Sequence, residues 1–130
     1  MYRSTTKNVT VSVEPTYLSG ESEPEQNVYV WAYKVRIENN GPETLQLKTR
    51  YWKITDAYGR VQEVHGKGVV GEQPILKPGD SFEYTSGTPL STPSGIMTGT
   101  YAMEKANGAL MDIAIPAFSL HTPDVAQRLN

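Results

Sequence analysis

Residues 29–38 read YVWAYKVRIE, and this stretch decides the fold class. Large apolar side chains take alternate positions, and Lys34, Arg36 and Glu38 stand between or after them. The apolar set is Tyr29, Trp31, Tyr33, Val35 and Ile37. A repeat of two residues is typical of a β-strand with one buried face. We therefore expect a core strand here, in a nearly all-β protein.

The same alternation recurs along most of the chain. It predicts further strands at residues 9–13, 45–55, 61–65, 81–86, 101–103 and 111–115, with 116–120 extending the last of them. Pro15 is expected to break the first strand, and a shift of the apolar phase near Tyr51 and Trp52 predicts a β-bulge. Turn residues at 56–59 and at Asn107-Gly108 predict two hairpins.

Seven short strands with two hairpins predict an antiparallel β-sandwich of the fibronectin type III or immunoglobulin-like kind. In that arrangement the strands at 9–13, 29–37 and 81–86 share one sheet, and the other four form the second. Loops 39–42, 66–79 and 106–108 would then meet at one end, and loops 18–25, 56–59 and 88–94 at the other. We expect a single domain over residues 1–130, with the sandwich at about 7–120 and a C-terminal tail at 121–130.

Composition excludes several functional classes. The 130 residues include 12 basic and 14 acidic side chains, so no strong field of one sign favours nucleic acid or a membrane surface as partner. The absence of cysteine excludes a disulfide scaffold, a thiolate zinc site and a thiol nucleophile. The N-terminus lacks the apolar segment of a secretory signal, and no run of about 20 apolar residues occurs. A cytoplasmic protein without a cofactor is the expectation.

Half of the glycines and prolines lie in residues 66–95. Residues 66–71 read GKGVVG, which matches both a dinucleotide-binding pattern and the glycine spacing of a P-loop. Glu72, Gln73 and Pro74 follow, and they supply neither a helix start nor the Lys and Ser/Thr of a P-loop. Two interpretations stay open. The glycines serve backbone conformation, or exposed amides bind phosphate or pyrophosphate, with the anion site at Gly66, Lys67, Gly68 and Gly71.

Four apolar residues make this glycine-rich segment unusual: Val69, Val70, Ile75 and Leu76. They either cap the core or present an apolar surface to a protein partner. The candidate partner-binding residues are Gly66, Lys67, Gly68, Val69, Val70, Gly71, Glu72, Gln73, Ile75 and Leu76.

A divalent cation is a second candidate ligand. Glu21, Glu23 and Glu25 could gather oxygen ligands together with Asp56, which is expected at the same end of the sandwich. His65 and His121 do not stand at metal-ligand spacing, and no nucleophile-elbow motif marks a serine. No catalytic residue can therefore be named, and the protein is expected not to be an enzyme.

Two further expectations concern the strand surfaces. Lys34, Arg36, Lys48 and Arg50 should point outward from their strands. The strands at 9–13 and 111–115 should be unprotected edges, which could pair two copies of the chain in a homodimer.

The segments 66–74, 76–79 and 82–87, together with 51–56, 97–103 and 115–118, are similar to the ApaG family. This resemblance covers almost the whole chain and implies a fibronectin-like or immunoglobulin-like sandwich. The bacterial family is linked to cobalt tolerance and magnesium efflux, and its glycine motif has prompted a pyrophosphate-binding idea. Related eukaryotic domains occur in F-box substrate adaptors and in a polymerase-associated protein. The resemblance therefore implies protein recognition, by a partner that it does not identify.

Overall fold

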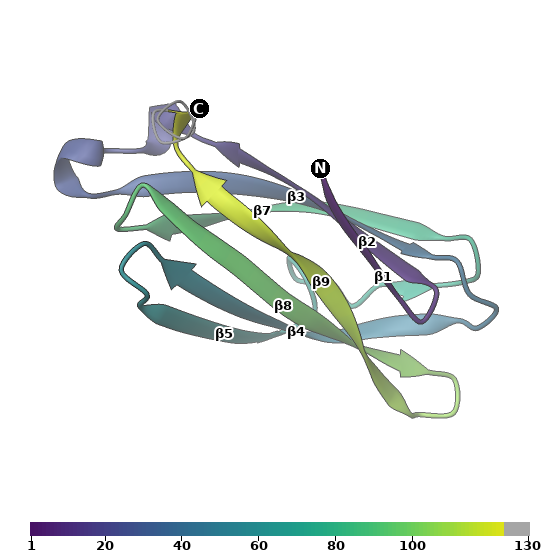
Figure 1. Cartoon of the computed structure of the whole chain (residues 1–130). Helices are drawn as coiled ribbons and strands as arrows, with labels where there is room; N and C mark the ends of the chain where they lie inside the picture. The colour runs from purple at the N-terminus through teal and green to yellow at the C-terminus, as the bar shows by residue number, and fades with distance from the viewer. Residues whose placement is uncertain (124–130) are drawn as a thin grey trace.

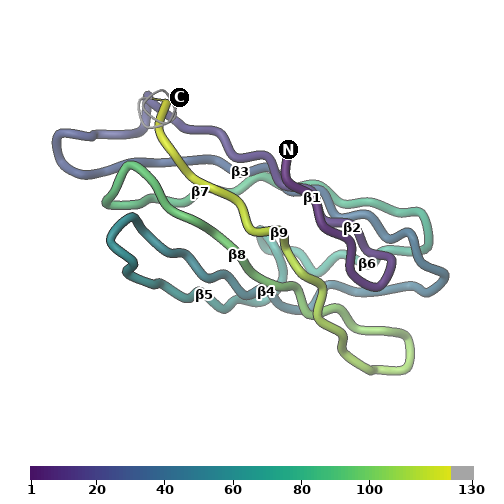
Figure 2. The backbone as a smooth tube through the Cα atoms, in the orientation of Figure 1, coloured from purple at the N-terminus to yellow at the C-terminus, as the bar shows by residue number. Residues whose placement is uncertain are grey.

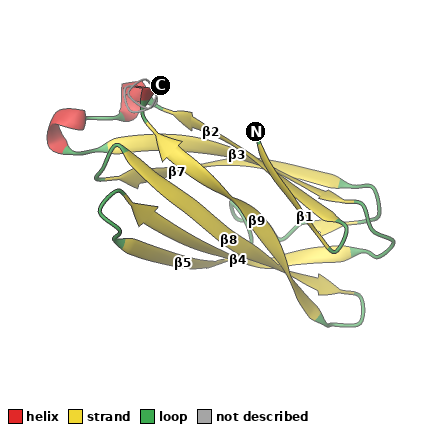
Figure 3. Cartoon of the chain, viewed as in Figure 1, coloured by secondary structure: helices red, strands yellow, loops and turns green. Residues whose placement is uncertain are grey.

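Two antiparallel sheets pack face to face in the computed structural model, which describes residues 1–123 (Figure 1). The first sheet has the order β1-β2-β3-β7, and the second has the order β5-β4-β8-β9, with β6 paired to β4. The strands are β1 (Tyr2–Thr6), β2 (Val9–Tyr17), β3 (Tyr29–Asn39), β4 (Leu45–Asp56), β5 (Val61–Lys67), β6 (Ile75–Leu76), β7 (Ser81–Leu90), β8 (Ser94–Lys105) and β9 (Leu110–His121). Two short 3-10 helices, η1 (Ser19–Glu21) and η2 (Pro24–Gln26), lie together at one end (Figure 3).

The predicted β-sandwich and its division into two sheets are confirmed. The structure has nine strands where seven were predicted, because β1 and β6 were missed. β1 joins β2 through Lys7 and Asn8, which both have positive φ (48° and 69°) and so form a two-residue hairpin turn without the usual glycine. Residues 9–13 are consequently an internal strand, and the prediction that they form an edge was wrong.

The other predicted edge strand, β9, is the last strand of its sheet, but β1 lies against it. Ser4 Oγ donates to the Ala114 carbonyl at 3.2 Å, and the Ala114 N–H donates to Thr6 Oγ1 at 3.3 Å. Side chains of β1 thus occupy backbone groups that a second copy would need for pairing through this part of the edge.

The expected break at Pro15 is wrong, because β2 continues to Tyr17. Pro15 pairs with Tyr33 of β3, whereas pairing with β1 ends at Val13. A proline lacks an N–H donor and is tolerated in a strand where that side faces no neighbour. The short length of β1 therefore explains how β2 passes through a proline.

The core lies between the sheets and is built from the predicted alternation. Trp31, Val35 and Ile37 of β3 are at most 1% exposed, as are the three valines of β2. Tyr33, Trp52 and Phe118 pack ring against ring, with centroids 5.3–6.0 Å apart. This cluster joins β3 of the first sheet to β4 and β9 of the second, which fixes how the sheets face each other.

The predicted bulge in β4 exists, but it lies between Leu47 and Thr49, a few residues before the predicted position. One extra residue shifts the alternation, so that Leu47 and Trp52 both face the core. Arg50 pairs with Gly66 and the buried Tyr101, which places its side chain on the inner face. The prediction that Arg50 points outward was therefore wrong.

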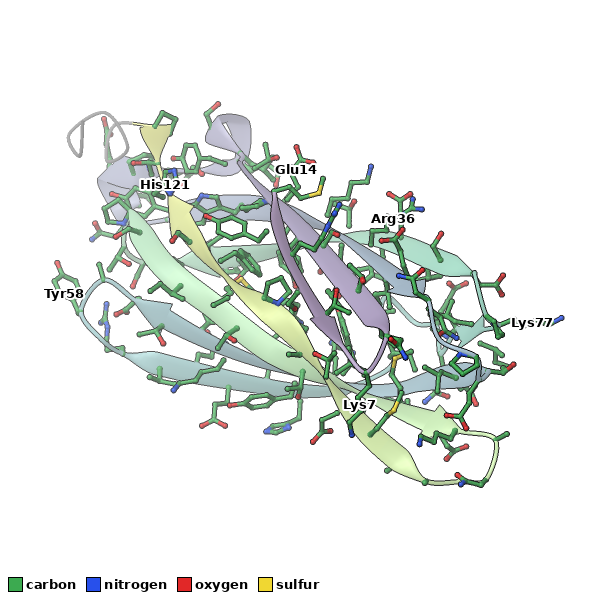
Figure 4. The ribbon with its side chains drawn as sticks, turned by 45° about the vertical axis from the view of Figure 1, so that its right-hand side comes forward. Lys7, Glu14, Arg36, Tyr58, Lys77 and His121 are labelled. Carbon is green, nitrogen blue, oxygen red and sulfur yellow. The ribbon has the colours of Figure 1, made fainter. Side chains whose placement is uncertain are left out.

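The two ends of the sandwich collect the predicted sets of loops. At one end the Asn39 N–H donates to the Asp80 carbonyl at 2.9 Å, and the Asn39 amide group donates to the carbonyls of Glu43 and Leu76. At the other end the Ala57 N–H donates to Thr92 Oγ1. Figure 4 shows Tyr58 and Lys77 at these opposite ends. Residues 124–130, most of the expected tail, lie outside the described residues.

Candidate functional site

The segment 66–71 is the end of a strand followed by a tight turn. Gly66 and Lys67 belong to β5. The Val69 N–H then donates to the Glu72 carbonyl at 2.8 Å, and the Glu72 N–H returns to the Val69 carbonyl at 2.9 Å. The central residues, Val70 and Gly71, both have positive φ (42° and 82°), as a type I′ turn requires. The glycines of 66–71 therefore shape a hairpin-like tip rather than the start of a phosphate-binding helix.

Two amides of residues 66–71, together with that of Glu72, already have acceptors. The Gly68 N–H donates to the Lys48 carbonyl at 2.9 Å, and the Val69 and Glu72 amides close the turn. Arg50 Nη1 donates to the carbonyls of Lys67 and Gly68, so these two oxygens are also used within the fold. Of the four residues expected to bind an anion, Gly68 therefore has its amide used within the fold.

Two of the glycines are explained by close packing. A Cβ at Gly66 would overlap the Arg50 guanidinium, which lies directly over this residue. Gly68 has a φ of +66°, and a Cβ there would overlap the Glu72 carbonyl oxygen. Gly68 therefore requires the absence of a side chain, because its neighbour is backbone, whereas a side chain at Gly66 would displace the Arg50 guanidinium.

The four apolar residues of the segment divide into two pairs. Val69 and Leu76 are 0% and 3% exposed and belong to the core. Val70 and Ile75 are 57% and 61% exposed. Val69 and Leu76 thus cap the core, as one interpretation from the sequence has it, while Val70 and Ile75 are exposed, and binding of a partner by these two stays a prediction.

Side-chain hydrogen bonds attach this segment to β4. Gln73 Nε2 donates to the Lys48 carbonyl at 2.9 Å, and Gln46 Nε2 donates to the Gln73 carbonyl at 3.1 Å. The Leu47 N–H donates to the Pro74 carbonyl at 3.0 Å. The turn is therefore presented to solvent on an ordered support.

The four carboxylates of the expected cation site are not brought together. Among residues 1–123 the structure has no group of three or more Asp, Glu or His side chains placed to hold a metal ion. Asp56 instead stabilises the β4–β5 turn, where its carboxylate accepts the Tyr58 and Arg60 N–H groups and pairs with Arg60 Nε at 2.7 Å. Glu21 lies in η1, Glu25 lies in η2, and Glu23 lies between these helices.

The hydrogen bonds of this turn also affect the pKa of the Asp56 carboxyl group. Desolvation acts to raise its pKa, but the hydrogen bonds from Arg60 and Tyr58 and the charge of Arg60 outweigh that effect and hold the pKa below its usual value. The carboxylate is therefore ionised at neutral pH, with its oxygens already occupied by donors.

A polar cluster inside the sandwich was not anticipated from the sequence. The Tyr84 and Tyr101 hydroxyls hydrogen-bond to each other between β7 and β8. Burial raises the pKa of both phenols, and it also raises the pKa of Tyr33. The charge of Arg50 acts in the opposite direction on all three. The sequence signals for the cluster were the tyrosines within the predicted strands at 29–37, 81–86 and 101–103, whereas the inward turn of Arg50 follows from the observed position of the bulge.

The histidines occupy separate strands of the second sheet. His65 is exposed on β5, and its ring lies 4.8 Å from that of Tyr51 on β4. His121 ends β9, where its carbonyl accepts Trp31 Nε1 at 3.2 Å. Neither histidine lies in the 66–76 segment.

The structure was also searched for membrane-spanning helices. Among residues 1–123 it contains none with the length and hydropathy that a membrane span needs.

These features define a class: a two-sheet β-sandwich domain that presents an apolar turn tip on an ordered support. Comparison with known proteins is consistent with this class and specifies the family. The family model described as the ApaG domain matches residues 19–105. The chain belongs to the ApaG family.

Individual relatives match over the full length. The chain is 60% identical to Protein ApaG of Parvibaculum lavamentivorans and 62% identical to Protein ApaG of Paramagnetospirillum magneticum, in both cases over 100% of each chain. Among solved structures, the ApaA protein of Bordetella pertussis is 52% identical with a TM-score of 0.86, over 88% of this chain and 94% of that one.

Proposed function

We propose that this protein is a non-enzymatic protein-interaction module that contacts its partner through the turn at residues 66–76, with Val70 at the centre of the contact. The conformation of Val70 carries the proposal. A β-branched residue at positive φ is rare and costs about 1–3 kcal/mol. Glycine or asparagine would fit the same backbone with less strain. An exposed valine here is therefore explained by a contact outside the folded chain.

The surroundings of Val70 support this proposal. The turn is held to β4 by the side chains of Gln46 and Gln73, so little conformational entropy would be lost on binding. Ile75 adds a second exposed apolar side chain from the same segment. By resemblance to the bacterial family, the module would act in cobalt or magnesium homeostasis through its protein partner rather than by holding the ion itself.

Two substitutions at Val70 test the proposal. Val70→Gly should raise the free energy of unfolding by about 1 kcal/mol, because glycine relieves the positive-φ strain and this gain exceeds its larger unfolded-state entropy. Val70→Asp should leave the fold intact. Both variants should lose the protein captured by the wild type from native cytosol. Urea unfolding measures the first effect, and quantitative affinity capture measures the second.

Tyr58→Asp is the matched control. Tyr58 is 79% exposed and lies at the opposite end of the sandwich, so this variant should retain the captured protein. Capture that is equally strong with wild type, Val70→Gly and Val70→Asp would contradict the proposal.

A further inference from the structure

One side of the sandwich is open. On the opposite side β1 lies beside β9 and closes the gap between the sheets (Figure 2). On the open side β7 is the last strand of the first sheet, and β5 is the last strand of the second. Within residues 1–123, no strand pairing and no backbone hydrogen bond joins β5 to β7. The sandwich therefore ends on this side in two separate strand edges.

The edge of β7 has free backbone groups. Just before this strand the Asn39 N–H donates to the Asp80 carbonyl at 2.9 Å, so Asp80 directs its backbone toward β3. This direction alternates along an antiparallel ladder, and the register of β7 with β3 has no bulge. The residues whose backbone groups point away from β3 are therefore Ser81, Glu83, Thr85, Gly87 and Pro89. Proline is expected in this outward set, because it has no N–H to donate. Another strand can thus pair with most of β7.

Arg50 is a partly buried cation without a counterion at the open side. Its guanidinium group lies over Gly66 of β5. No carboxylate of residues 1–123 forms an ion pair with it, and Glu83 of β7 pairs with Lys34 and Arg36 instead. A charge withdrawn from water is stabilised by pairing with an opposite charge. The described part of the fold does not supply that opposite charge.

The guanidinium group also has unused donors. Its hydrogen bonds within residues 1–123 are those from Nη1 to the carbonyls of Lys67 and Gly68. An arginine side chain carries five N–H donors in a planar fork. No buried side-chain nitrogen or oxygen of the described residues lacks a partner, so Nε and Nη2 of Arg50 are open to solvent. Two parallel N–H groups of this kind fit the two oxygens of a carboxylate.

Arg50 faces the strand whose edge is free. It shares a register row with Gly66 and Tyr101 on the inner face of the second sheet. The Tyr101 hydroxyl hydrogen-bonds to the Tyr84 hydroxyl of β7. A strand added to β7 would direct its inner side chains toward the second sheet, about 10 Å away, and the one opposite Tyr84 would point to the row of Arg50.

We propose that the open side of the sandwich binds an extended acidic peptide segment, which adds a strand to β7 and places a side-chain carboxylate on Arg50. In strand addition the backbone hydrogen bonds supply affinity, and sites for alternate side chains supply specificity. The charge of Arg50 makes an acidic residue the preferred one at the position opposite Tyr84. Val70 belongs to neither β4 nor β7, so this contact is separate from the one in the proposed function.

A hollow on the same side gives a second specificity position. Its volume is about 400 Å³, and the apolar part of its lining is Ile54, Val61, Pro89 and Leu90. Leu90 follows Tyr84 by six positions in β7, so a residue of the added strand six positions from the acidic one reaches the hollow. The bound segment should therefore carry an acidic and an apolar residue six positions apart, both facing inward.

Two peptides with blocked ends test the proposal by isothermal titration calorimetry. TLTVTVTET has a leucine and a glutamate six positions apart, in the order that antiparallel addition to β7 requires, and TLTVTVTQT lacks only the carboxylate. The wild type should bind the first with a Kd below about 1 mM and the second about tenfold more weakly. Arg50→Gln should bind the two equally. Arg3→Gln, on the closed side in β1, should discriminate as the wild type does.

Thr85 offers a matched pair of variants that test the edge of β7. Thr85→Pro removes an outward N–H and should abolish binding of both peptides, whereas Thr85→Val keeps this donor and should bind as the wild type does. Proline is tolerated at an outward position of an edge strand, as Pro89 shows in the same strand. Circular dichroism checks that each variant is folded.

Each remaining outcome decides the proposal. A wild type that binds neither peptide at 1 mM, or binds both equally, would overturn it, as would unchanged binding by Thr85→Pro. A second copy of the chain is the alternative occupant. A wild-type dimer that Thr85→Pro converts to a monomer in sedimentation equilibrium would show that β7 pairs with itself, which also overturns the proposal. Val70→Asp should bind both peptides normally, so this contact and the one at Val70 stand or fail separately.

Discussion

Gly99→Ala should destabilise the protein by about 4 kcal/mol or more, which for a small domain approaches complete unfolding. Gly99 lies in β8 opposite Trp52, and a Cβ there would overlap the backbone carbonyl oxygen of Tyr51 in β4. Backbone atoms cannot turn away as a flexible side chain can. The two central strands of the second sheet would have to separate, at a position where the register of β8 against β9 also shifts.

Gly20→Ala is the matched control for this substitution. A Cβ at Gly20 has no heavy atom within 4 Å, so the same chemical change should alter stability by no more than about 0.5 kcal/mol. Urea unfolding of both variants against the wild type makes the comparison. A Gly99→Ala protein as stable as Gly20→Ala would show that β4 and β8 are not held as closely as the structure indicates.

Alkaline pH should destabilise the wild type steeply above pH 10. Burial raises the pKa of Tyr84 and Tyr101 above the usual value of about 10 for a phenol. Above that pH the unfolded chain loses these protons and the folded chain retains them. Stability is therefore fully present below pH 10 and falls as pH rises toward the folded-state pKa values, by about 1.4 kcal/mol per pH unit for each phenol.

A variant with Tyr84→Phe and Tyr101→Phe isolates this effect. The two hydroxyls hydrogen-bond to each other, so replacing both tyrosines leaves no buried hydroxyl without its partner. Its free energy of unfolding should decline less than that of the wild type, by about 2 kcal/mol between pH 10 and 11, the interval in which the unfolded-state phenols go from about half to nine-tenths ionised. Tyr58→Phe, at an exposed position, should retain the wild-type slope. Parallel slopes for the wild type and the double variant would contradict the assignment.

Strand alternation and turn residues were enough to predict the layout of both sheets. The alternation at 29–37 and the turns at 56–59 and 107–108 act through neighbouring residues, so they are readable without tertiary structure. Predictions failed where a segment distant in the sequence determines the local structure. β1 was missed because Lys7 and Asn8 are unusual hairpin residues, and β2 tolerates Pro15 only because β1 ends early.

The candidate site was predictable in position but only partly in structure. The apolar glycine segment identified the right loop, yet its four hydrophobic residues could not be divided into buried and exposed pairs. That division depends on the pairing of residues 75–76 with 45–46 of β4, about 30 positions away. The expected cation site was likewise not predictable from spacing alone, since the Asp56 carboxylate accepts hydrogen bonds from the N–H groups of Tyr58 and Arg60.

An all-β sandwich, its core strands and the segment at 66–76 were readable from the sequence, because alternation and turn chemistry are local properties. That Arg50 turns inward over Gly66 and that Val70 is exposed and strained became known only from the folded structure. Each of these depends on which strands pair and in what register. Register joins residues far apart in the chain, so no local pattern contains it.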